Sequence, residues 1–425
     1  YDSPTVTAGN APGLNDGAGA VVLASGKAVA EHGLKPMAKI LAWGHAGVEP
    51  SVMGLGPVKA VPIALERAGL TLDQIDVIES NEAFAAQACG VAGELGFDPA
   101  KTNPGFNWED VLPGLRASTS WNGVPGGELG SADAKQWCMP WGYELNNISY
   151  NKVMFDKVKV EPPKNLDEMV ATSAKLTKDL GGPYGIGVRG SRSWASIHPG
   201  FLSGYANFGE KDFTVTDGKL KAAMNSAGSK DFHKKWVQMI QESGPKDWST
   251  YTWYQVGTDL GAGASAMIFD ADILGYFQNG GTKEAGNLAF HGFKANPAAA
   301  APTPNIWIWS LAMSSFSKDK DATWYFMQWA SGVEHAIFGA TKMDFVNPVR
   351  NAVWKDEIFV EKLKKYPGYF EMFTASAPGA SIKFTPQPLF FDLTTEWAAT
   401  LQKMVAKEVP VDEGLDALAE SINGQ

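Results

Sequence analysis

The stretch from Trp137 to Lys152, WCMPWGYELNNISYNK, combines side chains that could hold a polyhydroxylated ligand. Two short apolar-aromatic runs flank a polar insert, and the side chains of interest are Trp137, Trp141, Tyr143, Glu144, Asn146 and Asn147. Aromatic rings stack on an apolar ligand face, while polar groups hydrogen-bond the ligand's rim. The pattern favours a sugar-binding surface; the alternative is a strand pair whose rings fill a core.

Composition bounds the class of protein. The chain has 425 residues, of which 44% are hydrophobic and 19% charged, as in soluble globular proteins of two or three domains. The net charge of −10 argues against a nucleic-acid partner. Three prolines interrupt the longest uncharged stretch, residues 295–317, so we expect no direct membrane insertion.

Only two cysteines occur, Cys89 and Cys138, so we expect neither a disulfide nor a thiolate metal site, and no cofactor. The sequence starts YDSPTVTAGN, without an initiator Met, a basic region or an apolar run. We therefore expect no signal peptide in this chain.

The composition changes near residue 105. Of the fifteen tryptophans, only Trp43 precedes Asn107, and the first hundred residues are rich in Gly and Ala. Lys101 to Asn107 (KTNPGFN) has the Pro, Gly and Asn of a linker. The predicted domains are therefore residues 1–104 and residues 105–425.

The first segment has the pattern of an α/β unit, with strands alternating with helices. Strands are predicted over Ala18 to Ser25, Met37 to Trp43 and Ile75 to Glu79, and helices over Pro57 to Ala68 and Glu82 to Leu95. Gly69 and Gly96 should end the two helices.

Three motifs of this segment, in order, are TVTAGNAPGLNDGAGAVVL (Thr5 to Leu23), GVEPSVMGLGP (Gly47 to Pro57) and ESNEAFAAQA (Glu79 to Ala88). They resemble the thiolases, the acetyl-CoA acetyltransferase family, over residues 1 to about 102. The resemblance implies a partial thiolase-like α/β unit in which Asn81 helps to hold a water at an oxyanion site. It also implies a cytoplasmic location.

The rest of the thiolase machinery is missing. The family's nucleophilic Cys lies upstream of these motifs, and its Gly-His-Pro and Cys-x-Gly motifs do not follow residue 102. His198-Pro199-Gly200 imitates one of them, about a hundred residues too late. No complete catalytic set is present, so we expect no acyl transfer.

The second segment is again α/β. Asn165 with Glu168 predicts a capped helix that ends at Leu180, before Gly181. Further helices are predicted around Phe232 to Ile240, Ala322 to Trp329 and Trp397 to Met404, and strands over Tyr184 to Val188, Ser265 to Phe269 and Ile306 to Met313.

Three stretches, Tyr143 to Met169, Ala264 to Phe277 and Asn305 to Ala330, resemble the extracellular solute-binding proteins of bacterial ABC importers for carbohydrates and polyols. The resemblance implies a two-lobe periplasmic-binding-protein-like fold that closes on its ligand by a hinge, here with an incomplete first lobe. It further implies a sugar or polyol ligand, importer membrane subunits as partners, and a periplasmic location.

The candidate ligand-binding residues are Trp141, Tyr143, Glu144, Arg189, Arg192, Trp194, Trp253, Asp270, Trp307, Trp309 and Arg350. Trp307 and Trp309 face one side of a strand, either as a stacking surface or as a core wall. Asp270 is a hydroxyl acceptor or a helix cap. Arg189 and Arg192 offer forked donors from a loop, unless that loop is simply solvated.

The sequence thus predicts a chimeric chain whose function, carbohydrate or polyol binding for an ABC importer, lies in its second part and involves no chemistry. The alternatives are an acetyl-CoA acetyltransferase fragment and a nonfunctional fusion or assembly artefact.

Overall fold

The computed structural model describes residues 20–81, 83–97, 106–193, 197–345 and 347–424. They form two compact units, and each is described by itself. The first unit comprises residues up to Asn107 together with Met313–Gly332, and the second comprises Trp108–Ala312 and Val333–Gln425. The boundary at residues 104 and 105 stays a prediction.

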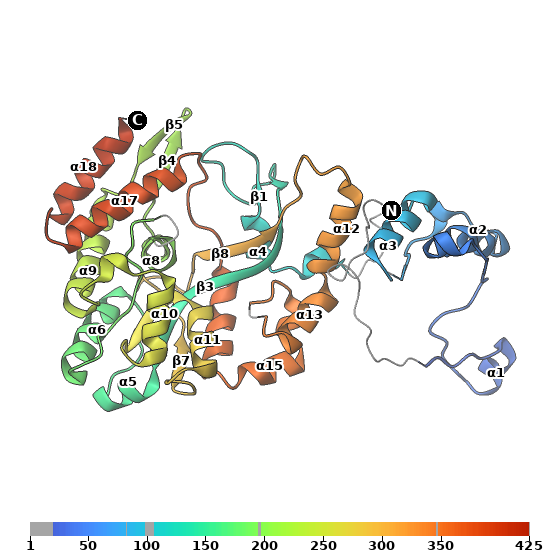
Figure 1. Ribbon diagram of the computed structural model, residues 1–425, viewed down its shortest axis with the longest axis horizontal. Coiled ribbons are helices and arrows are strands. Elements are labelled where there is room, and N and C mark those ends of the chain that lie inside the picture. The colour runs from blue at the N-terminus through green and yellow to red at the C-terminus, as the bar shows by residue number, and fades with distance from the viewer. Residues whose placement is uncertain (1–19, 82, 98–105, 194–196, 346, 425) are drawn as a thin grey trace. The chain divides into compact units, whose positions relative to one another are not determined.

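The described part of the first unit is built from short helices (Figure 1). They are α1 (Gly26–Glu31), η1 (Pro50–Leu55), α2 (Gly56–Ala68), η2 (Leu72–Gln74), α3 (Ala85–Leu95) and α12 (Lys320–Ala330). The predicted helices correspond to α2 and α3, and both end at glycines in the left-handed region, Gly69 (φ 68°) and Gly96 (φ 66°). Helix α12 packs against α3.

Among the described residues of this segment, the predicted strands are absent over residues 20–25 and 37–43, and the stretch from Ile75 to Glu79 contains one bridge residue, Ile78. Residues 18 and 19 of the first predicted strand lie outside the described residues. Residues 20–25 are exposed, with Val22 93% accessible, and residues 37–43 carry no strand either. A strand is stable only when its backbone groups find partners and one face is covered. The described apolar run at residues 20–25 is not covered on either face.

The second unit is organised by one long strand, β3 (Met139–Asn151). The first half of β3 pairs antiparallel with β8, and its second half lies between β6 and β7. The stretch predicted as two runs with a polar insert is thus a single continuous strand with an irregularity between Pro140 and Gly142. The insert stays in the strand because its backbone groups are paired on both sides.

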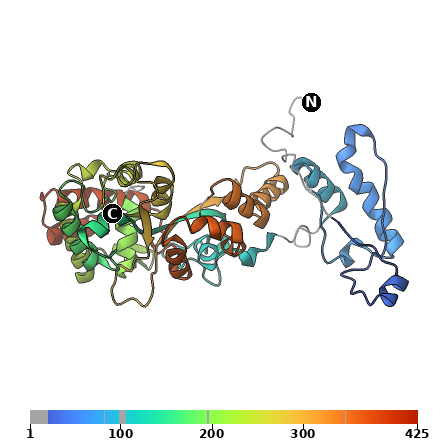
Figure 2. The same cartoon turned by 90° about the horizontal axis from the view of Figure 1, so that it is seen from below.

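Two large apolar cores define the two lobes of this unit, and Figure 2 shows β3 running between them. The first-lobe core includes Leu145, Ile306 and Trp354. Around it lie η4 (Trp108–Asp110), α4 (Pro113–Ser118), β8 (Ile306–Leu311), α13 (Val333–Lys342), α14 (Asn351–Trp354), α15 (Glu357–Leu363), α16 (Tyr369–Ser376) and η7 (Ala377–Gly379), with β1 (Ser120–Trp121) and β2 (Lys135–Gln136) beside α4.

The second-lobe core includes Ile148, Trp236 and Trp397. Its elements are α5 (Lys152–Val158), α6 (Leu166–Leu180), η5 (His198–Leu202), α8 (Ser203–Phe208), β4 (Phe213–Thr216), β5 (Lys219–Ala222), α9 (Ala227–Ser243), η6 (Trp248–Thr250), α17 (Phe390–Val405) and α18 (Val411–Asn423). A smaller cluster is formed by α10 (Trp253–Ala262), β6 (Met267–Ala271), α11 (Asp272–Gly281) and β7 (Leu288–His291).

Local signals determine several of these elements. The Asn165 side chain accepts a hydrogen bond from the Glu168 N–H (3.0 Å), and the Glu168 carboxylate accepts from the Asn165 amide (2.8 Å). Helix α6 accordingly runs to Leu180, as predicted. The stretch from Tyr184 to Val188 makes only isolated parallel bridges to β6 and the residues before it, so this predicted strand is shorter than expected.

Side chains close one edge of β3. The Leu145 N–H donates to Asp272 Oδ1 (3.0 Å), and Asn347 Nδ2 donates to the Tyr143 carbonyl (2.7 Å). The Tyr369 hydroxyl donates to Asp272 Oδ2 (2.7 Å) and also lies 2.6 Å from Asn347 Oδ1. Burial raises the pKa of Asp272 to about 6, against the lowering effect of the Tyr369 hydrogen bond.

The outer edge of β8 follows from the same bonds. The backbone N–H and C=O groups of Tyr143 and Leu145 point away from β8. In an antiparallel pair, two opposite residues both point inward or both point outward. The backbone groups of their partners, Ile308 and Ile306, therefore point away from β3. By alternation Ser310 points outward as well. Among the described residues, no backbone hydrogen bond reaches the N–H groups of Ile308 and Ser310 on this edge. The segment is uncharged, so nothing repels another strand.

We expect the protein to associate through this edge, because unpaired backbone groups beside apolar side chains recruit further strands. Ser310→Lys should reduce association measured by light scattering, since a lysine on an edge strand opposes pairing. Ser249→Lys places the same charge at another exposed serine and should leave association unchanged. A monomeric parent protein with one cooperative melt would contradict this expectation.

Candidate functional site

Glu144 and the two indoles of β8 meet across the first half of β3. Glu144 lies opposite Trp307 in the strand register, and Trp309 Nε1 donates a hydrogen bond to Glu144 Oε1 (3.2 Å). The Trp309 ring stays 54% exposed, whereas Trp307 is half-buried. One carboxylate and one accessible aromatic face therefore stand side by side.

A forked ion pair lies at the end of β6. Arg189 Nε donates to Asp270 Oδ2 (2.9 Å), and Arg189 Nη2 donates to Asp270 Oδ1 (2.7 Å). Asp270 is fully buried and Arg189 is 8% exposed. Asp270 Oδ1 also accepts the Ala271 N–H (2.7 Å). Bidentate pairs of this kind are rigid and strongly directional, so the guanidinium is held in a fixed orientation.

The Glu144 carboxylate responds to the charges of the Arg189–Asp270 pair. Burial raises the pKa of Glu144 from its ordinary 4.5 to about 7, and the Arg189 charge and the Trp309 hydrogen bond counter part of that rise. The charges of Asp270 and Asp272 add to it. Glu144 thus shares one electrostatic environment with the Arg189–Asp270 pair.

His198 fixes the Trp307 indole, and sequence reasoning missed it in this role. Its ring meets Trp307 edge-on at 5.4 Å between centroids and also packs against Phe390 (4.8 Å) and Phe384 (5.1 Å). Burial, followed by the Arg189 charge, lowers the pKa of His198 to about 3, so the imidazole is neutral. A histidine in an apolar cage acts here as a flat packing surface, and no local sequence signal announces that.

A second aromatic group borders Trp309. Trp141 packs on Phe345 with ring centroids 4.9 Å apart. A Cβ at Gly142 would come within 3.1 Å of the Phe345 ring and 3.9 Å of the Trp309 Cβ. Glycine at this position therefore lets the Phe345 ring lie close to β3, and a larger residue would have to displace that ring by a few tenths of an ångström.

Two predicted residues lie away from this cluster. Tyr143 is buried in the first-lobe core, and burial and the Asp272 charge raise the pKa of its hydroxyl. Arg350 is fully buried at the start of α14, where burial lowers its pKa to about 10 against the effect of Asp110. The structure does not bring these two side chains to Glu144.

The remaining candidates lie on surfaces. Arg192 is exposed in the loop that follows Arg189, and Trp253 is 55% exposed at the start of α10. The Gly190 and Ser191 N–H groups both donate to the Tyr251 carbonyl (3.0 Å each), so the segment before Trp253 is tied to the Arg189 loop. Trp194 lies outside the described residues. Asn81, in the first unit, is exposed.

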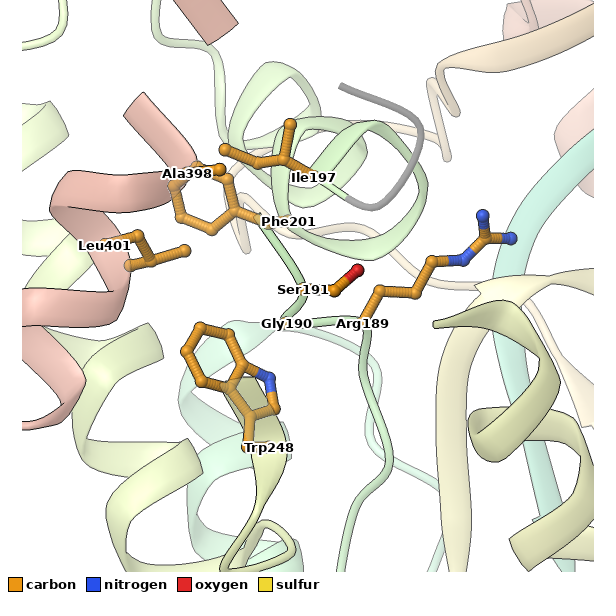
Figure 3. A pocket seen from close by; sticks show the side chains of 8 residues that line it. All are labelled: Arg189, Gly190, Ser191, Ile197, Phe201, Trp248, Ala398 and Leu401. Atoms are coloured by element: carbon orange, nitrogen blue, oxygen red, sulfur yellow. The ribbon is translucent and has the colours of Figure 1, made fainter. Parts of the chain in front are cut away.

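A crevice behind the Arg189 loop is too small for a sugar. It encloses about 10 Å³, room for about one water molecule, and is lined by Arg189, Gly190, Ser191, Ile197, Phe201, Trp248, Ala398 and Leu401. Figure 3 shows the Arg189 side chain directed away from the Trp248 indole. The side chains that line this crevice therefore pack behind the loop, and the Arg189 guanidinium is bonded to Asp270.

Different parts of the chain are similar to different known proteins. An erythritol/L-threitol-binding protein of Mycolicibacterium smegmatis is 38% identical over 304 residues, which are 71% of this chain and 63% of that protein. Residues 34–105 match the thiolase C-terminal domain. The beta-ketothiolase BktB of Cupriavidus necator is 60% identical over 103 residues, 24% of this chain and 26% of that protein. The two parts resemble two different families.

The second unit has the two-lobe fold of solved ABC transporter solute-binding proteins. An ABC transporter solute-binding protein from Agrobacterium vitis with bound D-mannitol aligns with a TM-score of 0.61 and 19% identity, over 75% of this chain and 77% of that one. The chain spans less than two thirds of the length of both curated relatives. Among the described residues, no helix is long and apolar enough to cross a membrane.

The pKa of Glu144 predicts how stability depends on pH. The folded state holds this proton more tightly than the unfolded state, so the free energy of unfolding should fall as the pH rises from 4.5 to about 7. The contribution is on the order of 3 kcal/mol. Glu144→Gln should flatten this part of the stability curve in urea titrations.

Glu128→Gln is the matched control, because it removes a carboxylate from an exposed position. It should leave the slope between pH 4.5 and 7 unchanged. Parallel pH profiles for the parent and Glu144→Gln would show that Glu144 does not titrate in this range.

Proposed function

We propose that the solute-binding part binds a neutral sugar or polyol in the cleft between its lobes and delivers it to an ABC importer. The observation that carries this proposal is the Glu144 carboxylate beside the indoles of Trp307 and Trp309, with the charges of the Arg189–Asp270 pair acting on it.

The chemistry of these groups matches vicinal hydroxyls. The Glu144 carboxylate accepts hydrogen bonds from hydroxyl groups, and the Arg189–Asp270 pair supplies further charged partners, so neighbouring hydroxyl groups can bridge the two. The exposed Trp309 face offers a stacking surface for the C–H side of the ligand. Trp141 extends that surface and belongs to the proposed site, as do Arg192, Trp194 and Trp253 on their loops.

The relatives support a polyol in particular. The name of the Mycolicibacterium protein refers to erythritol and L-threitol, and the Agrobacterium structure contains D-mannitol. Such ligands carry no charge, so a site that already pairs Arg189 with Asp270 internally needs no counter-ion from the ligand. Binding of this kind requires no cofactor.

The partners and the location follow from the same proposal. A solute-binding protein passes its ligand to the membrane subunits of an importer, outside the cytoplasm. The first part carries the thiolase resemblance, whose location is cytoplasmic, and it supplies no residue to the proposed site.

Thermal shift with a panel of sugar alcohols and sugars tests the proposal, because a ligand of the folded state raises the melting temperature. Asp270→Asn and Trp309→Ala should each weaken binding of the best ligand. Losing one charge-assisted hydrogen bond costs roughly 1.5 to 3 kcal/mol, which is about one to two powers of ten in affinity.

The control is Trp137→Ala, since Trp137 is exposed and its indole donates only to the Trp121 carbonyl (2.8 Å) in the described structure. It should leave affinity unchanged. The proposal fails if an organic anion or a peptide shifts the melt and no carbohydrate or polyol does.

The thiolase-like part should have no acyltransferase activity, because the family's nucleophile and its two later motifs have no match in this sequence. Incubation with acetoacetyl-CoA and CoA should show no thioester loss. Turnover that persists in Cys89→Ala and Cys138→Ala variants would contradict this expectation and place the chemistry at a residue other than the two cysteines.

A further inference from the structure

Three segments of the second unit run from one core to the other. In β3, Leu145 belongs to the first-lobe core and Ile148 to the second. The segment before β8 leads from Ala295 to Ile306, and the segment before α17 leads from Ile382 to Phe384. A movement between the lobes must bend these segments.

Asn305 lies in the segment before β8, and its side chain is buried. This side chain bonds directly to the segment before α17 and is linked to β3 through Ser203. Its Oδ1 accepts the Lys383 N–H (2.9 Å), and its Nδ2 donates to the Ser203 hydroxyl (3.4 Å). That hydroxyl donates in turn to Asn146 Oδ1 on β3 (2.8 Å). Asn305 is 2% exposed and Ser203 is fully buried.

The backbone of the same region is tied down as well. The Asn305 N–H donates to Asn207 Oδ1 (3.1 Å), and the Ser381 N–H donates to the Pro304 carbonyl (3.3 Å). A primary amide suits this position because it carries an acceptor and a donor on one flat group. An aspartate would lack the donor, and an apolar side chain would leave the half-buried Lys383 N–H without its Asn305 acceptor.

We propose that Asn305 is the positioning residue of the hinge, which fixes the angle between the two lobes by tying three crossing segments together. Closing the cleft moves these segments relative to one another, so the network around Asn305 must hold one arrangement and resist others. The angle in turn sets the separation between ligand-binding groups that the two lobes present.

The test measures the distance between the lobes directly. Spin labels on Ala171→Cys in α6 and Lys355→Cys after α14 report it, since both positions are exposed and their helices pack in different cores. Cys89 and Cys138 are replaced by serine in every variant. Asn305→Leu should broaden the ligand-free distance distribution and shift its centre.

Two further variants keep the outcome interpretable. Ser203→Ala removes the hydroxyl that joins Asn305 to Asn146 and leaves the bond from the Lys383 N–H to Asn305 in place, so it should give a smaller broadening, even where Asn305→Leu folds poorly. Asn279→Ala is the matched control, because Asn279 is also buried and accepts two backbone N–H groups near its own helix, those of Gly286 (2.8 Å) and Leu288 (3.1 Å). It should lower the melting temperature and leave the distance distribution unchanged.

The inference is overturned if Asn305→Leu and Ser203→Ala reproduce the parent distribution, or if Asn279→Ala broadens it as much. These distance measurements need no ligand, so they stand apart from the proposed function. A second arm rests on the proposed function: with a confirmed polyol ligand, Asn305→Leu should reduce affinity about tenfold, the equivalent of one net hydrogen bond.

Discussion

Both lobes and the candidate site depend on the register of β3. Its first half is bonded to β8, and its second half to β6 and β7. Because side chains alternate along a strand, this register sets Glu144 opposite Trp307 and Asn147 opposite Asp270. A shift of the β3 register by one residue would turn every β3 side chain to the other face, and would disrupt both apolar cores and the candidate site.

The polar groups around β3 are buried, and burial gives them their properties. A buried group without a partner costs about 1 to 3 kcal/mol, which is why Asp272 and Asn347 close the free edge of β3 and Asp270 holds Arg189. A pair fixed in this way loses little freedom when a ligand arrives. Stability of the fold and readiness of the site therefore come from the same hydrogen bonds.

Helix caps and helix ends could be predicted from the sequence, since Asn165 and Gly69 act on neighbours a few residues away. The pairing of Arg189 with Asp270 and of Trp309 with Glu144 spans 81 and 165 residues, and no local pattern carries that information. The types of residue were therefore predictable, but their grouping was not. The strands predicted at residues 20–25 and 37–43 are absent from the described structure, because an apolar run does not reveal whether a partner strand exists.

The carboxyl group of Glu144 also has a thermodynamic consequence for binding. With a pKa of about 7, it exists in both protonation states near neutral pH. A ligand that prefers one state must draw a fraction of a proton from the solvent or release it. The heat of binding measured in a calorimeter would then include the ionisation heat of the buffer, and would differ between phosphate and Tris at the same pH.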